Sequence, residues 1–435
     1  MSSEWEIVEV GDVCSVGDGA HSKVARQTNG VPYLTSKNIG QGQLKPQSLD
    51  YISLDDFERL FPFKSKATRR PQSGDILIGI IGTFGNSYVY KESDHFGFSS
   101  SIGLLRPDNS KLDSLFLYYV ITSTKFRVVH ENFNAGSVQG YTNIATVKKL
   151  KVPLPPLSAQ KKIALILAAL DDRITLLRET NATLEAIAQA LFKSWFVDFD
   201  PVHAKQQGLA PEGMDEATAA LFPDSFEESE LGLVPRGWLA GTLGDIATTV
   251  RKQLQPSELH SELHYVGLEH IPRKSLSLSA WDSADGLESA KAVFSKGDIL
   301  FGKLRPYFHK VVIAPFDGIC STDILVCQSK KSAYYGIGAM HLSSTPLIAY
   351  AERLSNGAKM PRVNWKDLAE YPVCVPSEAL AVNFSETITP LISRMTANVH
   401  QARTLATMRD TLLPRLISGR LRLLEIETAL EGVAA

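Results

Sequence analysis

A heptad stripe between Pro153 and Pro201 is the feature that most constrains how this chain folds. Its positions recur in steps of four and three, as in a coiled-coil seam, and nine of the ten are apolar. These positions are Ile163, Leu167, Leu170, Ile174, Leu177, Asn181, Leu184, Ala188, Leu191 and Trp195. Pro156 prevents an earlier start, and Ser158 is the expected N-cap. The stripe therefore predicts one helix of 39 residues, Ser158 to Phe196, about 58 Å long at 1.5 Å per residue.

A second copy of this stripe lies 221 residues further along, so that Pro376 corresponds to Pro155. Eight of its ten seam positions are apolar; the full set is Phe384, Ile388, Leu391, Met395, Asn398, Ala402, Leu405, Arg409, Leu412 and Leu416. The repeat continues upstream, where PQSGDILIGIIGTFGN from Pro71 resembles FSKGDILFGKLRPYFHK from Phe294. The chain is therefore predicted to contain two copies of one unit, a strand-rich module followed by a long helix.

The two stripes are predicted to bury each other as an antiparallel helix pair, since a single apolar stripe cannot be buried by one helix alone. Aligning the helix centres places Asn181 and Asn398 at nearly mirrored heights. We expect these side chains to meet across the seam and fix its register at some cost in stability. The alternative is that both face solvent at the edge of the seam. Pro390 lies inside the second stripe and predicts a kink or a broken first turn.

Length and composition indicate a globular protein of two to three domains. The chain has 435 residues, of which 44% are hydrophobic and 21% charged. It lacks any run of about 18 apolar residues, and its acidic N-terminus does not resemble a signal peptide. Four scattered cysteines without metal-ligand spacing fit a reducing compartment, so we expect a cytoplasmic protein.

The predicted fold class is α+β, with two similar mixed α/β modules separated by two long antiparallel helices that form a coiled-coil spacer. The predicted segments follow in order. They are a first module at 1–156, a first spacer helix at 157–200, an acidic linker at 201–236, a second module at 237–376, a second spacer helix at 377–420 and a tail at 421–435.

The charge distribution points to nucleic acid more than the net charge does. The net charge is −2, which argues mildly against a nucleic-acid binder. However, 201–232 holds seven acids and one Lys, whereas 59–70 holds five bases and no acid. A near-neutral total can therefore hide a basic face, and the acidic linker is expected to lie away from any duplex.

Basic side chains and a glycine-rich loop supply the candidate DNA contacts. The loop is NAGSVQGYTNI, from Asn134 to Ile144, and LSNGAKMPRVNW occupies the corresponding place in the second module. Such loops can approach a phosphate or a base edge closely, although a tight connector would also have this composition. Each Lys or Arg taken singly is more often a solvated surface charge. The candidates are Lys23, Arg26, Lys37, Lys64, Lys66, Arg69, Arg70, Ser137, Gln139, Tyr141, Arg251, Lys252, Lys303, Arg305, Lys359 and Arg362.

No constellation of catalytic residues is recognisable in the sequence. There is no GxxxxGK[ST] phosphate loop, no Asp/Asn-Pro-Pro-Tyr/Phe tetrapeptide of the kind expected at a base-methylating amine site, and no His or Cys cluster spaced for zinc. Asp198 and Asp200 do not share a helix face in the way that positions three or four apart do. We therefore expect a recognition scaffold with no catalytic residues, no metal and no cofactor of its own.

Several stretches resemble the specificity subunits of type I restriction–modification systems. They are PLPPLSAQKKIALILAALDDRI, ALFKSWFVDFDPV, LFPDSFEESELGLVPRGW and the closing RDTLLPRLISG, and the likeness covers nearly the whole chain. The second copy departs from this pattern, because SEALAVNFSETI lacks the Gln that Gln160 supplies in the first, a difference that bears on a partner contact there.

The resemblance implies two target-recognition domains, each reading half of a split site in double-stranded DNA, and a helical spacer that fixes the gap. It also implies two methyltransferase subunits docked around the family's conserved regions, and a further translocase–nuclease (restriction) subunit. S-adenosylmethionine, ATP and Mg²⁺ would then belong to those partners.

Two other functions remain open at this point. One is a self-contained DNA methyltransferase, which the missing tetrapeptide and nucleotide loop disfavour. The other is a coiled-coil scaffold that binds only protein, which predicts no salt-dependent DNA binding by the complex. The near-neutral net charge gives the scaffold some support.

Overall fold

The chain forms two compact units. The computed structural model describes residues 5–46, 48–63, 68–82, 85–132, 142–355 and 360–421. Unit 1 comprises Met1–Asp172 with Leu405–Ala435, and unit 2 comprises Arg173–Thr404. Each unit holds one module together with parts of both long helices, so the chain returns to unit 1 after completing unit 2. Within the described residues, no helix is long and apolar enough to cross a membrane.

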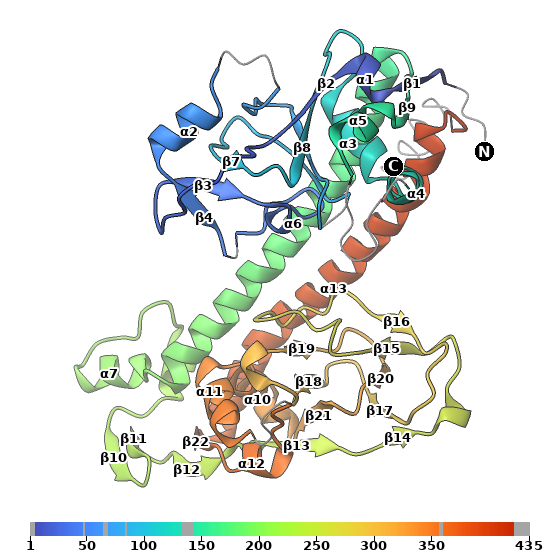
Figure 1. The fold of residues 1–435 in the computed structure, drawn as a ribbon. Helices are drawn as coiled ribbons and strands as arrows, with labels where there is room; N and C mark the ends of the chain where they lie inside the picture. Colours follow the sequence, from blue (N-terminus) through green and yellow to red (C-terminus); the bar gives the residue numbers. More distant parts are fainter. Residues whose placement is uncertain are drawn as a thin grey trace. The chain divides into compact units, whose positions relative to one another are not determined.

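Unit 1 is built from short strands and short helices (Figure 1). Before the first long helix these are β1 (Ile7–Glu9), α1 (Val10–Val13), β2 (Cys14–Asp18), β3 (Val31–Leu34), η1 (Ser36–Asn38), β4 (Asp50–Ile52), α2 (Leu54–Leu60), β5 (Ile76–Gly79), β6 (Ser87–Val89), β7 (Gly97–Phe98), β8 (Ile102–Pro107), α3 (Ser114–Thr122), α4 (Thr124–Asn132), α5 (Ile144–Lys149) and β9 (Lys151–Pro153).

Three sheets organise unit 1. The largest has the order β2-β8-β5-β6 with every pair antiparallel, and its central strand β5 is fully buried. A second sheet, β4-β3-β7, contains the parallel pair β3–β7. β1 and β9 pair antiparallel and bring the start of the module beside its end.

Unit 2 repeats this plan with additions. Its elements outside the long helices are α7 (Asp200–Gln206), α8 (Glu216–Ala220), β10 (Phe226–Ser229), β11 (Gly232–Pro235), β12 (Leu239–Thr242), α9 (Leu243–Ile246), β13 (Ala247–Val250), β14 (Gln253–Leu254), η2 (Pro256–Glu258), β15 (His264–Val266), β16 (Asp282–Ser283), β17 (Lys291–Phe294), β18 (Ile299–Gly302), η3 (Pro306–Phe308), β19 (Val311–Ile313), β20 (Gly318–Cys320), β21 (Ile324–Ser329), η4 (Ser332–Tyr334), α10 (Tyr335–Leu342), α11 (Thr345–Leu354), α12 (Trp365–Ala369) and β22 (Pro372–Val375).

The sheets of unit 2 confirm the internal repeat. Its four-stranded sheet, β13-β21-β18-β19, is antiparallel throughout and corresponds strand for strand to β2-β8-β5-β6. The pair β12–β22 corresponds to β1–β9, and the parallel pair β15–β20 corresponds to β3–β7. Both modules are therefore mixed α/β structures of the same design, as the sequence predicts.

Two 40-residue helices, α6 (Leu157–Phe196) and α13 (Glu378–Ile417), belong partly to each unit. Their ends match at the predicted offset, from 157 to 378 and from 196 to 417. Every position of both predicted seams lies within the described residues and is buried or half-buried. In unit 1, Ile163 of α6 shares a core with Leu416 of α13, and in unit 2, Phe192 shares one with Phe384. In each unit the start of one helix thus meets the end of the other, so the pair is antiparallel.

The predicted N-cap Ser158 and the predicted broken turn at Pro390 are wrong. α6 begins at Leu157, so Ser158 lies inside the first turn, and the Pro156 carbonyl accepts from the N–H groups of Ala159 (2.8 Å) and Gln160 (3.0 Å). α13 continues through Pro390 without a break, and Ile388 and Ile392 are buried in the core on either side. Packing there outweighs the backbone hydrogen bond that proline removes.

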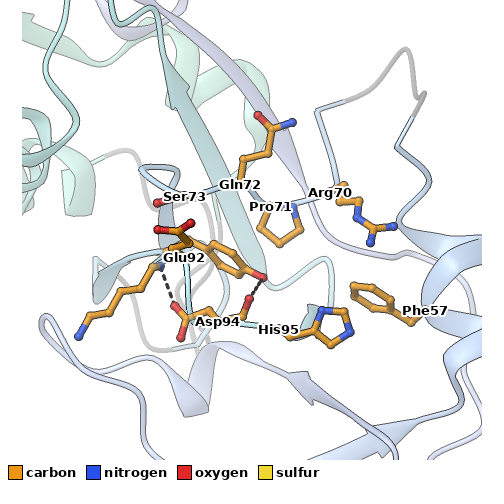
Figure 2. Close-up of a pocket in the computed structure, with 10 residues that line it drawn as sticks. Phe57, Arg70, Pro71, Gln72, Ser73, Glu92, Asp94 and His95 are labelled. Atoms are coloured by element: carbon orange, nitrogen blue, oxygen red, sulfur yellow. Dashed lines mark hydrogen bonds between the residues drawn. The ribbon is translucent and has the colours of Figure 1, made fainter.

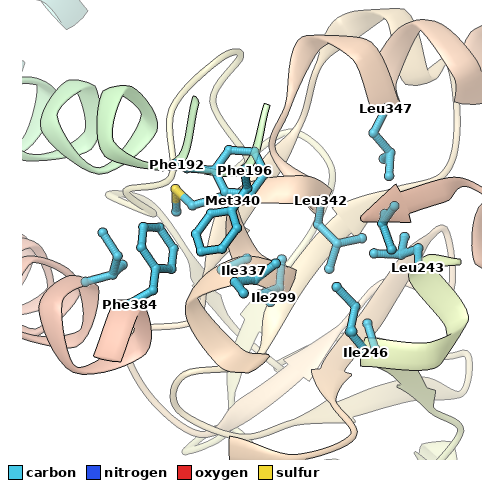
Figure 3. Close-up of a cluster of buried hydrophobic side chains, with 14 of the residues drawn as sticks. Phe192, Phe196, Leu243, Ile246, Ile299, Ile337, Met340, Leu342, Leu347 and Phe384 are labelled. Atoms are coloured by element: carbon cyan, nitrogen blue, oxygen red, sulfur yellow. The ribbon is translucent and has the colours of Figure 1, made fainter. Parts of the chain in front are cut away.

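The core of unit 2 joins both long helices to the module. Phe192 and Phe196 of α6 and Phe384 of α13 gather against Ile337 and Met340 of α10 (Figure 3). The rings of Phe196 and Phe384 meet edge to face at 4.8 Å. Because aromatic side chains bury large apolar areas, this cluster anchors the helix pair firmly to the module.

Candidate nucleic-acid interface

Three loops of unit 2 gather basic side chains on its surface. The first follows β15, the second joins β18 to β19, and the third leads into α12. The Lys274 N–H donates to the His309 carbonyl (2.8 Å), and the Arg305 N–H donates to the Pro361 carbonyl (2.8 Å), so the loops are joined through their backbones. We call these three loops the basic loops. Their six cations are Arg273, Lys274, Lys303, Arg305, Lys310 and Arg362.

Two acids, Asp323 and Glu269, lie close to cations of the basic loops. Arg362 pairs with Asp323, Nε to Oδ1 at 3.2 Å, and its side chain stays 48% exposed. Burial, and then the charge of Arg273, lower the pKa of Lys310, while Glu269 partly offsets this. Lys303 and Lys310 are half-buried, and the Lys310 ammonium donates to the Leu268 carbonyl, whereas the other four cations are exposed. Exposed cations gathered on joined loops fit the phosphates of a nucleic acid, which supply closely spaced negative charge.

The structure brings only some of the second-module candidates together. Lys303, Arg305 and Arg362 meet in the basic loops, where the Val363 N–H donates to the Lys303 carbonyl (3.1 Å). Arg251 and Lys252 are exposed on a different connection, between β13 and β14. Arg273 and Lys274, which join this group, were not among the candidates predicted from sequence. The available signal was an adjacent basic pair shortly after a strand.

In the first module, three candidates are exposed. Lys23 and Arg26 lie between β2 and β3, and Lys37 lies in η1. Arg26 forms an ion pair with Asp50. Lys23 and Lys37 remain predicted DNA contacts. Arg26 also remains one, but its guanidinium would contact DNA while it is paired with the Asp50 carboxylate.

Arg70 is held inside its own module. Its guanidinium donates to both carboxylate oxygens of Glu58 (2.8 and 3.2 Å) and to the Phe61 carbonyl (3.0 Å), and it lies 3.5 Å from the centre of the Phe63 ring. The hydrogen bond from Arg70 lowers the pKa of Glu58. Arg70, Phe57 and His95 line a cavity of about 300 Å³ (Figure 2). This engagement gives Arg70 a structural role besides its predicted DNA contact. Arg69 beside it is half-buried.

The remaining candidates lie outside the described residues. They are Lys64, Lys66, Ser137, Gln139, Tyr141 and Lys359. All candidate contacts, described or not, therefore stay predictions from the sequence.

The predicted contact between Asn181 and Asn398 is present in unit 2. Asn398 donates through Nδ2 to Oδ1 of Asn181 at 2.8 Å, and both residues are buried. Asn181 in turn donates to the Met395 carbonyl (3.0 Å) and to Oγ of Ser277 (3.1 Å). The pair therefore links α6, α13 and the module, while its role in setting register stays a prediction.

Gln160 is buried within unit 1 and has no exposed surface. Its Oε1 accepts from the Asp113 N–H (2.8 Å), and its Nε2 donates to the carbonyls of Lys111 (2.9 Å) and Pro155 (2.8 Å). This side chain fastens the start of α6 to the loop before α3. Gln160 therefore makes contacts inside unit 1. The expectation that this glutamine bears on a contact with a partner subunit is corrected, because the side chain is fully buried.

Within the described ranges, no group of three or more His, Cys, Asp or Glu side chains is placed to hold a metal ion. The four cysteines are free, and burial raises the pKa of Cys14 and Cys320 to about 12, which makes them poor nucleophiles and ligands.

Known proteins similar to this chain are specificity subunits of type I restriction–modification systems. Residues 2–186 match the model of the type I restriction modification DNA specificity domain. The type I restriction enzyme EcoDI specificity subunit of Escherichia coli is 30% identical over 385 residues, covering 86% of this chain and 78% of that protein. The MjaIX specificity subunit of Methanocaldococcus jannaschii is 24% identical over 445 residues, covering 98% and 95%. A type I restriction–modification S subunit from M. genitalium shares the fold, with a TM-score of 0.57 at 15% identity over 95% of this chain and 96% of that one.

Proposed function

Because the chain belongs to the family of type I restriction–modification specificity subunits, we propose that it reads the DNA target of such a complex, one half-site with each module. The observation that carries this proposal is the duplication itself. One design, with the same four-stranded sheet order, occurs twice in a single chain. Two copies of one reading domain suit a target made of two separate half-sequences.

We further propose that the helix pair sets the gap between the half-sites. A continuous helix of 40 residues is about 60 Å long, which exceeds one ~34 Å turn of B-DNA. Two weak readings joined by a stiff connection multiply specificity through effective concentration. The buried Asn pair and the aromatic cluster of unit 2 support a helix pair that does not slide.

Catalysis would belong to partner subunits. Two methyltransferase subunits would dock on the long helices, and a restriction subunit would complete the complex. S-adenosylmethionine, ATP and Mg²⁺ would be held by those subunits. Leu176 and Ile187 of α6 support a docking role, because both are large apolar residues that remain exposed (50% and 44%).

The test is the methylation pattern of a host that carries the chain with its methyltransferase subunits. We expect one motif with two short halves and a fixed gap. Inserting one helical turn into both long helices at paired positions should change the gap and leave both half-sequences intact. A continuous motif, or an insertion that alters the half-sequences, would contradict the proposal. A complex that binds no DNA in a salt-dependent way would favour a protein scaffold instead.

A further inference from the structure

The turn between β18 and β19, residues 303–310, contains unusual backbone strain. Arg305 (φ 51°) and His309 (φ 51°) both adopt the left-handed conformation, and so does Lys274 (φ 52°), whose N–H bonds to the His309 carbonyl. Each such residue costs on the order of 1 kcal/mol or more when it is not glycine. Strain of this kind persists only where the surroundings enforce it, and it clusters at functional sites.

The surroundings hold this turn from several sides. Pro306 is buried, and the buried His309 ring donates from Nε2 to the Ser343 carbonyl at 2.8 Å. The Arg273 guanidinium lies 4.0 Å from the centre of the Phe308 ring. The Arg305 N–H donates to the Pro361 carbonyl. The turn is therefore fixed in shape before any ligand arrives, which is what accurate recognition requires.

The outward side of the turn presents a cation and an aromatic ring. Arg305 is exposed, and Tyr307 is 45% exposed while its ring contacts Phe308 edge to face at 4.7 Å. The other cations of the basic loops lie on the same joined loops, where Asp323 pairs with Arg362 and Glu269 lies near Lys310. A rigid turn that projects Arg and Tyr from a basic surface matches the chemistry of base edges flanked by phosphates.

We propose that residues 303–310 form the sequence-reading turn of the second module, with Arg305 and Tyr307 as specificity-determining residues. The inference rests on the proposed function and names the residues that carry it out. Arg305 would donate to a guanine edge, the commonest specific contact in the major groove, and the Tyr307 ring would cover a neighbouring base, such as a thymine methyl group. The remaining cations of the basic loops would bind phosphates and position the turn.

The first module offers a different turn at the equivalent place. Its β5–β6 connection, IIGTFGN from Ile80 to Asn86, has no Lys or Arg and contains glycines of positive φ at Gly82 and Gly85. Unlike side chains at equivalent turns predict unlike half-sequences. A change in the second turn should therefore affect only one half of the target.

The test uses the complete chain assembled with its methyltransferase subunits and reads the methylated sites by sequencing. Tyr307→Ala and Arg305→Gly should each relax one or two positions of one half-site, with about a tenfold or greater loss of discrimination there, and leave the other half unchanged. Glycine suits the left-handed backbone of residue 305, so folding is retained. Lys296→Ala, at an exposed cation between β17 and β18 that is not a candidate contact, serves as the control and should keep the full motif.

The outcomes separate this inference from the function on which it rests. If the unaltered complex yields no two-part motif, the proposed function fails. If it does, and Tyr307→Ala and Arg305→Gly still give the unaltered motif, only the reading turn is refuted. Relaxation of both halves together would also refute it. Tyr307→Phe keeps the ring, so it should preserve the motif if the ring covers a base, and equal relaxation by Phe and Ala would contradict that assignment.

Discussion

Asn398 of α13 donates its side-chain amide to the side-chain oxygen of Asn181 in α6, at 2.8 Å and in a buried setting. Oδ1 of Asn398 itself has no hydrogen-bond partner among the described residues. The pair is therefore incompletely satisfied, and an incompletely satisfied buried amide reduces stability. We therefore predict that this seam exchanges stability for a defined alignment of its helices.

Replacing both asparagines by leucine should stabilise the helix pair. Either single change, Asn181→Leu or Asn398→Leu, leaves the other amide buried without its partner and should lower the free energy of unfolding by about 1–3 kcal/mol. The double change removes both polar groups and should exceed the unaltered chain by about 1 kcal/mol. Thermal or urea unfolding of all four chains measures the coupling. If the double variant instead lost an unfolding free energy equal to the sum of the two single losses, the two side chains would not act as a pair.

Gln160→Ala should weaken the attachment of α6 to the first module. The change leaves the Asp113 N–H and the carbonyls of Lys111 and Pro155 without the partner they have now. Because one buried group left unsatisfied costs about 1–3 kcal/mol, we expect a loss of roughly 2–4 kcal/mol for the site. The measurement is the unfolding free energy. Lys161→Ala, at the next and exposed position, is the matched control and should change it little.

The long helices and the repeat could be predicted from sequence because both follow from spacing. Heptad steps identify a buried face without knowledge of the partner, and every predicted seam residue is indeed buried or half-buried. Helix ends were less predictable. The start at Leu157 depends on the Pro156 carbonyl, and continuity through Pro390 depends on the core around Ile388. Both depend on contacts that only the folded chain supplies.

The candidate interface was less accessible to sequence reasoning. Arg273 and Lys274 join Arg305 only because backbone hydrogen bonds bring together loops that are about 30 residues apart in the chain. Arg70, by contrast, was predicted from the sequence as a DNA contact. In the structure its guanidinium donates hydrogen bonds to the Glu58 carboxylate and to the Phe61 carbonyl. Clusters of charge can be read from a sequence, but their neutralisation and their meeting in space cannot.

Leu176→Glu should reduce assembly with the methyltransferase subunits and leave the fold intact. Leu176 and Ile187 are 11 residues apart, about three helical turns, so they lie on one exposed face of α6. A carboxylate placed in an apolar contact is costly to desolvate, and we expect at least a tenfold weaker assembly. Size-exclusion chromatography of the mixed subunits measures it. Thr175→Glu adds the same charge about 100° around the helix and should assemble normally. Normal assembly of Leu176→Glu would remove this face from the proposed docking site.

His341 should make unit 2 sensitive to acid. It is 7% exposed, its ring meets Phe192 edge to face at 4.7 Å, and burial lowers its pKa to about 4. In the unfolded chain a histidine titrates near 6.5, so between about pH 6.5 and 4 the unfolded state binds a proton that the folded state does not. Stability is therefore complete above about pH 6.5 and falls as the pH is lowered towards 4, by up to about 3 kcal/mol.

His341→Leu should flatten this dependence, because leucine keeps the apolar contacts and cannot take up a proton. The measurement is the unfolding midpoint from pH 7.5 to 4.5, where the unaltered chain should lose more stability than the variant. His130 of unit 1 retains part of the slope in both, since burial also lowers its pKa to about 4. The exposed His260, changed to Ala, is the control and should follow the unaltered curve. Parallel curves for the unaltered chain and His341→Leu would show that His341 does not carry the acid sensitivity of unit 2.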